Sequence, residues 1–303
     1  LIFTVMTNMA TVDLFAIGNA LIDQEFKVSN EFLTQQALQK GTMQLTDGET
    51  QAALYQELQD TQNYKGQASG GSAANTTVAF SALGGTAFYG CRVGNDDLGS
   101  IYLNGLNEAG IKTAAQSISE GVTGTCMVLI SPDSERTMHT YLGITAELTA
   151  EQIDFEPLKT AKWLYIEGYL STSDTARIAV KQARELAKAH GVKIALSLSD
   201  PAMVQYARQG LEELLDDGVD LLFCNEQEAL MFTNTENLDD AIAALKLNNQ
   251  HIVITQGANG ATIIEPKQQF HVAGRHVDAV DTNGAGDAFA GAFLYSLFPD
   301  YIR

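Results

Sequence analysis

The sequence predicts an α/β protein with a mostly parallel central sheet, helices on both faces and a small second sheet. Two observations predict the central sheet. From Trp163 onward, short apolar runs alternate with amphipathic segments, and the longest amphipathic segment, 175–190, stops at Gly191, a common helix terminator. A third observation predicts the small sheet, because extended segments in the first half do not follow the alternation.

The first half of the chain is predicted to mix strands and helices. Helices are expected to end at Gly84 and at Gly110, and Pro132-Asp133-Ser134 favours a turn between two strands. The predicted strands are 13–18, 25–28, 43–46, 87–91, 123–130 and 137–142, and the predicted helices are 31–39, 49–58, 76–83 and 101–109.

The second half predicts a regular α/β alternation. The predicted strands are 163–167, 193–198, 220–224, 251–255, 261–265 and 270–273, and the predicted helices are 175–190, 211–216, 226–232, 238–247 and 287–297. Ligands in such folds bind at the carboxyl ends of the strands. Each glycine- or asparagine-rich motif of this sequence follows a predicted strand, so we expect these motifs to converge on one site.

Composition excludes several classes of partner. The 303 residues include 18 Lys and Arg against 37 Asp and Glu, a net charge of −19. Such a surface repels phosphate backbones and anionic lipid, so we expect neither nucleic acid nor membrane as a partner. The apolar start 1–6 lacks the basic flank of a signal peptide, and the three cysteines show no C-x-x-C spacing. We therefore expect a cytoplasmic protein with reduced thiols.

The segment 281–287 (DTNGAGD) carries the sharpest chemical signal. Gly284, Ala285 and Gly286 let the backbone approach a ligand closely, and the helix start after them offers unpaired N–H groups to an anion. Asp287 then stands beside the anion site, where it would serve as a base for an attacking hydroxyl. The alternative is a plain helix cap. P-loop, protein-kinase and G-x-G-x-x-G motifs are absent from the sequence.

These residues carry a family resemblance. Segment 281–287 resembles the C-terminal signature of the ribokinase-like (PfkB) kinases, and segment 69–75 (SGGSAAN) resembles their N-terminal signature. The resemblance implies one ribokinase-like kinase domain over about 13–297, with lid segments at about 23–48 and 112–142. Within the family, segments 18–23, 165–169 and 198–201 look most like bacterial adenosine kinases.

The resemblance implies ATP-dependent phosphorylation of the primary (5′) hydroxyl of a ribosyl substrate, with adenosine first. It makes Asp287 the catalytic base and the N–H groups of Gly284, Ala285 and Gly286 an anion hole for the transferred phosphoryl. It also places Arg136 within reach of that phosphoryl group. The alternative for Arg136 is a solvated turn residue. The implied substrate-binding residues are Asn19, Leu21, Asp23, Gly70, Gly71 and Asn75. Carboxylate and amide side chains suit sugar hydroxyls, although Asp23 is also explained as a turn carboxylate.

The resemblance also implies a nucleotide site. Asn225 and Glu228 match the N-x-x-E motif, with Glu228 holding Mg²⁺ through water, and Thr255, Gly257 and Gly260 match a loop against ATP. The alternatives are a helix cap by Asn225 and an ordinary hairpin at the glycines. Asp281 and Asn283 would help to bind a monovalent cation such as K⁺.

Two further alternatives stay open. The specificity is alternatively that of a ribokinase- or fructokinase-like sugar kinase. Arg303 follows Asp287 by only 16 residues, whereas family members usually continue further, so a non-catalytic sugar- or nucleoside-binding relative with an incomplete ATP site is the other alternative. An exposed edge of the small sheet would let two copies pair as a homodimer.

Overall fold

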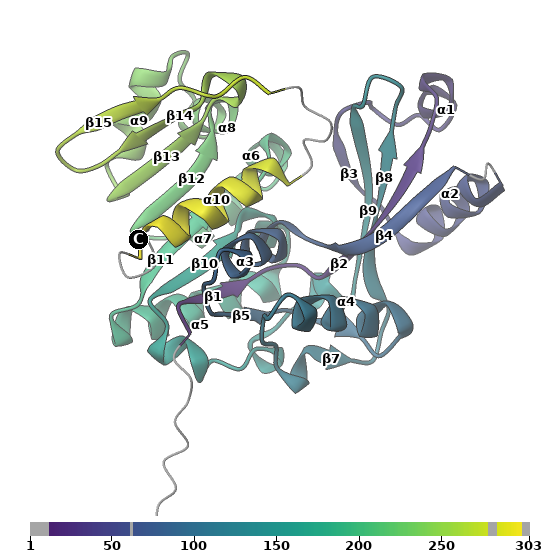
Figure 1. Ribbon diagram of the computed structural model, residues 1–303, viewed down its shortest axis with the longest axis horizontal. Coiled ribbons are helices and arrows are strands. Elements are labelled where there is room, and N and C mark those ends of the chain that lie inside the picture. The colour runs from purple at the N-terminus through teal and green to yellow at the C-terminus, as the bar shows by residue number, and fades with distance from the viewer. Residues whose placement is uncertain (1–11, 61–62, 278–283, 299–303) are drawn as a thin grey trace, which may run out of the picture.

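The computed structural model describes residues 12–60, 63–277 and 284–298. Eight strands form a large sheet (Figure 1), and in spatial order they are β15 (Gln269–Val272), β14 (Ala261–Ile264), β13 (His251–Thr255), β12 (Leu221–Asn225), β11 (Lys193–Ser197), β10 (Trp163–Glu167), β1 (Leu14–Ile17) and β5 (Ala87–Gly90). The strands from β13 to β5 pair in parallel, and β13, β14 and β15 pair antiparallel. This confirms the predicted fold class.

Helices cover both faces of the large sheet. One face carries α3 (Ser72–Ala82), α4 (Asp97–Glu108) and α10 (Ala285–Ser296), which share a buried apolar cluster with the sheet. The other face carries α5 (Asp174–His190), α6 (Pro201–Tyr206), α7 (Arg208–Leu215), α8 (Glu226–Thr233) and α9 (Leu238–Leu245) around a second cluster. Burial of these two apolar layers against the sheet is the main stabilising term of such a fold.

A second, five-stranded sheet forms a separate lobe (Figure 1). Its strands, in spatial order, are β3 (Met43–Leu45), β9 (Arg136–Gly143), β8 (Thr123–Ile130), β2 (Leu21–Lys27) and β4 (Tyr64–Gly70). The helices α1 (Asn30–Gln35) and α2 (Gly48–Asp60) pack on it through an apolar cluster that includes Phe26, Leu33 and Leu58. The short strands β6 (Val93–Gly94) and β7 (Ile118–Ser119) form a separate pair.

Strand β4 and helix α6 were not predicted from the sequence, and neither were the two-residue strands β6 and β7. Strand β4 reads YKGQASG, which has no apolar alternation, and most of its residues are exposed or half-buried because it is an edge strand held by backbone pairing with β2. Helix α6 is short, and it begins where Pro201 follows a cap by Asp200, whose carboxylate accepts from the Ala202 N–H at 2.7 Å. The small sheet therefore uses Tyr64–Gly70 in addition to the four predicted strands 25–28, 43–46, 123–130 and 137–142.

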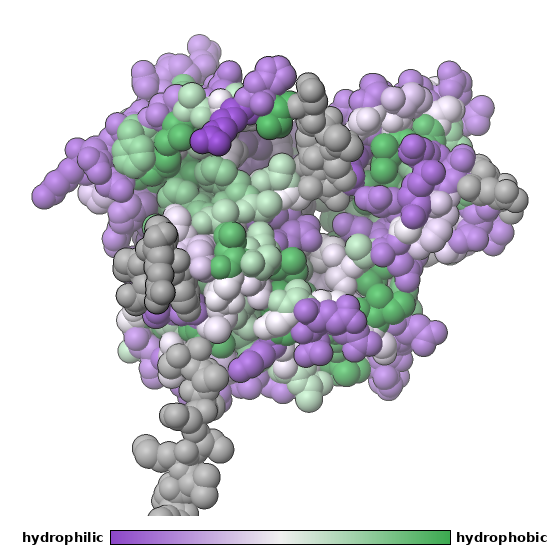
Figure 2. Space-filling view, viewed as in Figure 1, coloured by the Kyte–Doolittle hydropathy of each residue, from purple (hydrophilic) through white to green (hydrophobic). Residues whose placement is uncertain are grey.

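Several smaller expectations have a clear outcome. Cys91, Cys126 and Cys224 are buried free thiols, as predicted. Gly191 closes α5 in the left-handed conformation with φ of 71°, which confirms the predicted helix end. Within the described residues, no helix has the length and apolar character needed to cross a bilayer. Figure 2 shows polar side chains on the small-sheet lobe and paler or apolar residues over α10.

The arrangement of strands creates a crevice. Strand β1 lies between β10 and β5, and the chain leaves it in one direction towards β2 and the small sheet. Where the connections that leave two neighbouring strands run in opposite directions along the sheet, an opening remains between them at the carboxyl ends of the strands. Asn19 follows β1 and Glu167 ends β10, so both residues lie at this opening.

Helices α3 and α10 approach each other closely. A side chain at Gly291 would place its Cβ 2.4 Å from the Thr76 carbonyl oxygen and 2.8 Å from the Ala79 Cβ. Next to this contact, the Phe80 ring packs edge-on against Tyr295 at a centroid distance of 5.9 Å. The close approach matters because α3 carries Ser72 and Asn75, whereas α10 carries Asp287.

We expect Gly291→Ala to lower the free energy of unfolding by about 1–3 kcal/mol, because the added methyl group overpacks the contact between α3 and α10. This loss should exceed the small gain in helix propensity that alanine brings. Thermal unfolding followed by circular dichroism measures it. Ser296→Ala, at an exposed position of the same helix, is the control and should change the midpoint little. An unchanged midpoint in Gly291→Ala would contradict the close packing of the two helices.

Candidate active site

A cavity of about 370 Å³ lies between the two sheets. It is lined by the start of α10, the start of α3, the carboxyl ends of β1 and β10, and the inner face of the small sheet. Its volume falls in the usual range for small-molecule sites, about 300–1,000 Å³. The predicted site residues that line it are Asn19, Leu21, Asp23, Gly71, Asn75, Arg136, Gly284, Ala285, Gly286 and Asp287.

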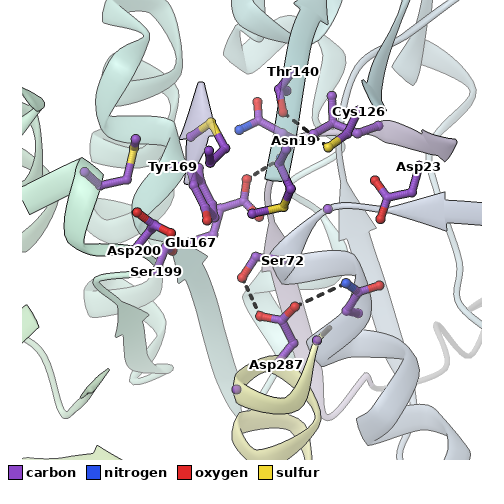
Figure 3. Close-up of a pocket in the computed structure, with 18 of the residues that line it drawn as sticks. Asn19, Asp23, Ser72, Cys126, Thr140, Glu167, Tyr169, Ser199, Asp200 and Asp287 are labelled. Carbon is purple, nitrogen blue, oxygen red and sulfur yellow. Dashed lines mark hydrogen bonds between the residues drawn. The ribbon is translucent and has the colours of Figure 1, made fainter. Parts of the chain in front are cut away.

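Asp287 stands in the first turn of α10 and points into this cavity (Figure 3). Its carboxylate accepts a hydrogen bond from the Ser72 hydroxyl at 2.7 Å and another from the Asn75 side-chain amide at 3.1 Å. Burial raises the pKa of Asp287 above its ordinary value, and these two hydrogen bonds act in the opposite direction. The carboxyl group is thus held in one orientation by two side chains of α3.

The start of α10 has the features of an anion site. Gly284 is the N-cap residue in the left-handed conformation with φ of 68°, and within the described residues no side chain caps the helix end. The first N–H groups of a helix have no partner inside the helix, and they carry the positive end of its dipole. Gly284, Ala285 and Gly286 all line the cavity, so this polar end faces the same space as Asp287.

Asp23 comes from the small sheet, on strand β2, and lies on the other side of the cavity from Asp287 (Figure 3). Its carboxyl group lies against Gly70, where a Cβ would come within 2.3 Å of the Asp23 Oδ1. Only glycine leaves room for the carboxyl there. Burial and the neighbouring Glu25 raise the pKa of Asp23 to about 7, against the lowering effect of Arg136.

Gly71 is constrained in a second way. Its φ of 97° lies in the left-handed region, and a Cβ there would be 2.5 Å from the Asn19 carbonyl oxygen. The pair Gly70-Gly71 therefore lets the chain turn from β4 into α3 while lying directly against Asn19 and Asp23. Gly70 itself does not line the cavity, so its part in the site is to make room for the Asp23 carboxyl.

Glu167 is a site residue to which the sequence analysis assigned no role. It is fully buried at the end of β10 and lines the cavity. Its carboxylate accepts from the Asn19 N–H at 2.7 Å and from the Ala73 N–H at 2.7 Å. Burial raises the pKa of Glu167 to about 7, although these backbone hydrogen bonds lower it. The signal in the sequence was a single acidic residue that ends the apolar run WLYIE.

Arg136 begins β9 and also lines the cavity. Its guanidinium lies 3.3 Å from the Glu25 carboxylate, and its side chain is 13% exposed. Because Arg136 also lowers the pKa of Asp23, its positive charge acts within the acidic cluster on the small sheet. The structure therefore places Arg136 in the cavity wall and not in a solvated turn.

The rest of the wall is largely apolar. These side chains come from the small sheet and from the loops after β10 and β11, and they are Leu21, Met43, Leu45, Cys126, Met138, Leu142, Tyr169 and Met203. The sequence analysis named only Leu21 among them, as a substrate-binding residue that the family resemblance implies. The methionines were missed because an apolar residue in a strand or helix is more often part of the core.

The predicted nucleotide residues form a second group, at the carboxyl ends of β12 and β13. Asn225 and Thr255 are direct partners in the sheet, and Gly257 and Gly260, with φ of 56° and 99°, make the hairpin that follows. Asn225 also caps α8, accepting from the Glu228 N–H at 2.8 Å, and its own N–H donates to the Glu228 carboxylate at 3.0 Å. None of these residues lines the cavity that holds Asp287.

The chemistry of this second group suits a nucleotide with its metal ion. Burial raises the pKa of Glu228 to about 7. Within the described residues, no three His, Cys, Asp or Glu side chains come together as a metal cluster. Magnesium keeps several waters and uses few protein ligands when it binds with nucleotide phosphates. The predicted cation residues Asp281 and Asn283 lie outside the described residues.

Comparison with known proteins gives one consistent family. Residues 41–299 match the model of the pfkB family carbohydrate kinases. The chain is 30% identical to adenosine kinase of Saccharomyces cerevisiae, over 95% of this chain and 89% of that protein. Among solved structures, it resembles adenosine kinase from Sinorhizobium meliloti, with 33% identity, a TM-score of 0.87 and coverage of 95% of this chain and 88% of that one.

A probable sugar kinase from Rhizobium etli CFN 42 is similar to the same degree, with 32% identity, a TM-score of 0.89 and coverage of 95% and 87% of the two chains. The resemblance drawn from segments 69–75 and 281–287 is thereby confirmed. These matches extend over nearly the whole chain and include relatives named for a nucleoside and for sugars. The chain therefore belongs to the pfkB family and is an ATP-dependent kinase that phosphorylates an alcohol group of a sugar or nucleoside.

Proposed function

We propose that this kinase phosphorylates the 5′-hydroxyl of adenosine. One observation carries the proposal: the carboxylate of Asp287, at the amide-rich start of α10, shares a cavity with Asp23 and with a wall of apolar side chains. The polar side suits a ribosyl group, since Asn19, Asp23 and Asn75 accept or donate hydrogen bonds to hydroxyls. The apolar side suits a flat, weakly polar base.

The apolar wall favours a nucleoside over a free sugar. Met43, Met138, Tyr169 and Met203 line the cavity together with Asp23 and Asp287, and we assign these four side chains to the base. A free sugar presents hydroxyl groups on most of its surface, and burying these against apolar side chains without hydrogen bonds costs free energy. A purine instead gains from contact with an aromatic ring and with polarizable sulfur.

In the proposed reaction, the protein mainly positions the reactants and stabilises charge. The 5′-hydroxyl loses its proton to the Asp287 carboxylate as its oxygen forms a bond to the γ-phosphorus of ATP, and the bond to the β-phosphate oxygen breaks to release ADP. The raised pKa of Asp287 helps it to hold that proton. The first-turn amides of α10 would stabilise the charge on the transferred phosphoryl, and Arg136 would add to it. The small sheet would act as a lid over this space.

The nucleotide would lie along the second group of residues. Thr255, Gly257 and Gly260 would contact ATP, and Asn225 and Glu228 would organise its phosphates, with Mg²⁺ supplying charge neutralisation when bound. The cap between Asn225 and Glu228 does not exclude this role, because carboxylate oxygens have further lone pairs for water. A K⁺ requirement would involve Asp281 and Asn283.

We expect Asp287→Asn to lower kcat by about 10²–10⁴, because it removes a positioned base while keeping the shape of the side chain. The affinity for adenosine should change little. A coupled assay of ADP release and calorimetric titration measure the two quantities. Asp97→Asn, an exposed acidic residue in the first turn of α4, is the matched control and should behave as wild type. Wild-type turnover in Asp287→Asn would remove this residue from the mechanism.

Adenosine affinity should depend on pH through Asp23. The pKa of this carboxyl is about 7 in the free protein, and hydroxyl donors favour its ionised form, so affinity should rise with pH through about 7 and level off above it. Calorimetric titration from pH 6 to pH 8.5 measures this.

Two variants separate this effect from the other buried carboxyls. Asp23→Asn should bind more weakly, by about 1.5–3 kcal/mol for each lost charged hydrogen bond, and without this pH dependence. Glu25→Gln removes a neighbouring negative charge, so it should keep the dependence and move its midpoint to lower pH. A flat profile in the wild type would place the ribosyl hydroxyls elsewhere.

Substrate preference decides between adenosine and a free sugar. In a coupled ADP assay, we expect kcat/KM for adenosine to exceed that for ribose and for fructose by at least about 10², because only the nucleoside has a base to contact the apolar side chains of the cavity. ATP titration in the absence of acceptor tests for a competent nucleotide site. Preference for ribose or fructose would favour a sugar kinase, and absent ATP binding would favour a non-catalytic relative.

A further inference from the structure

A second cavity, of about 730 Å³, adjoins the apolar end of the first. The two cavities share four lining residues, Met43 and Leu45 from β3, Thr172 after β10, and Met203 from α6. These shared residues belong to the apolar end of the first cavity. Asn19, Asp23 and Asp287, which would face the sugar, line only the first.

The partition between the two cavities consists largely of adaptable side chains. Met43 and Met203 are unbranched, and such side chains change rotamer easily to fit a ligand. Leu45 is 47% exposed and Tyr206, farther along the second cavity, is 78% exposed. Large apolar side chains with this much exposure beside a cavity provide contact area that the fold itself does not use.

The second cavity offers no unpaired positive charge to a ligand. Among the described residues that line it, Arg177 carries the only formal charge. Its guanidinium is 2.6 Å from the Asp174 carboxylate and 2.6 Å from the Glu213 carboxylate, and it also donates to the Ser171 carbonyl oxygen at 2.8 Å. Because two carboxylates more than neutralise this one positive charge, the cavity favours a neutral group and gives no attraction to a phosphate or carboxylate.

We propose that the second cavity is a subsite for a neutral, apolar substituent on the purine base. Its substrate class is then adenosine analogues that carry an alkyl or aryl group on the ring. This inference rests on the proposed function, because the ribosyl group must bind at Asn19 and Asp23 for the base to reach Met43 and Met203. The substituent passes between these two methionines and lies against Tyr206.

The test compares adenosine with three analogues, which carry a benzyl group at N6 or a phenyl group at C2 or C8. We expect the wild type to use at least one analogue with kcat/KM within about tenfold of that for adenosine. Gln209→Trp fills the second cavity from an exposed position, and it should lower kcat/KM for that analogue by at least about tenfold while leaving adenosine within about twofold. Gln205→Trp, also exposed but outside both cavities, is the matched control and should change neither value.

A second variant protects the test against misfolding. Tyr206→Ala only removes an exposed ring, and it should weaken calorimetric binding of the accepted analogue by about threefold to tenfold without affecting adenosine. Rejection of all three analogues by a wild type that phosphorylates adenosine would overturn the subsite, as would an unchanged preference in both Gln209→Trp and Tyr206→Ala. If adenosine itself is not phosphorylated, the proposed function fails, and calorimetric binding of the analogues relative to adenosine still decides the subsite.

Discussion

A buried carboxylate, that of Glu167, joins the two halves of the active site. It receives the N–H of Asn19, which begins the connection to the small sheet, and the N–H of Ala73, which lies in the first turn of α3. Asn75 and Ser72 on that same helix fix the Asp287 carboxylate. The proposed substrate-binding side and the proposed base are therefore positioned through one acidic side chain at the end of β10. A buried charge of this kind is tolerated because backbone N–H groups replace its lost hydration.

Electrostatics explain how an acidic protein can act on phosphate. The chain carries a net charge of −19, and the cavity itself is lined by Asp23, Glu167, Asp200 and Asp287. In the proposed reaction, attraction for the transferred phosphoryl would come from local groups, namely the dipole and amides of α10 and the guanidinium of Arg136. Burial, with the neighbouring carboxyls of Glu25 and Asp287, raises the pKa of Asp23 to about 7. Asp287 therefore stands beside the amides at the start of α10, whereas Asp23 and Glu167 come from strands β2 and β10.

Most of the fold could be predicted from the sequence, because the apolar residues recur regularly after Trp163 and glycines mark the ends of several helices. Strand β4 was missed because backbone pairing, which leaves no mark in an apolar pattern, holds it in place. In the site, the glycine-rich segments identified Asp287 and its amides, since close approach requires small residues. Glu167, Met43 and Met203 were not assigned a role, because acidic strand ends and methionines have more common structural explanations and only the tertiary arrangement brings them to the cavity.

The connection between the two sheets has a mechanical consequence. Only Gly18, Asn19 and Ala20 separate the end of β1 from the start of β2, and a side chain at position 18 would lie 2.6 Å from the Ala73 Cβ and from the Tyr89 hydroxyl. The connection is packed against neighbouring side chains, and the Asn19 N–H donates to the Glu167 carboxylate. We therefore expect it to be rigid and not a flexible linker. Because Asn19 lies in this connection, its proposed contact with a sugar depends directly on the orientation of the small lobe.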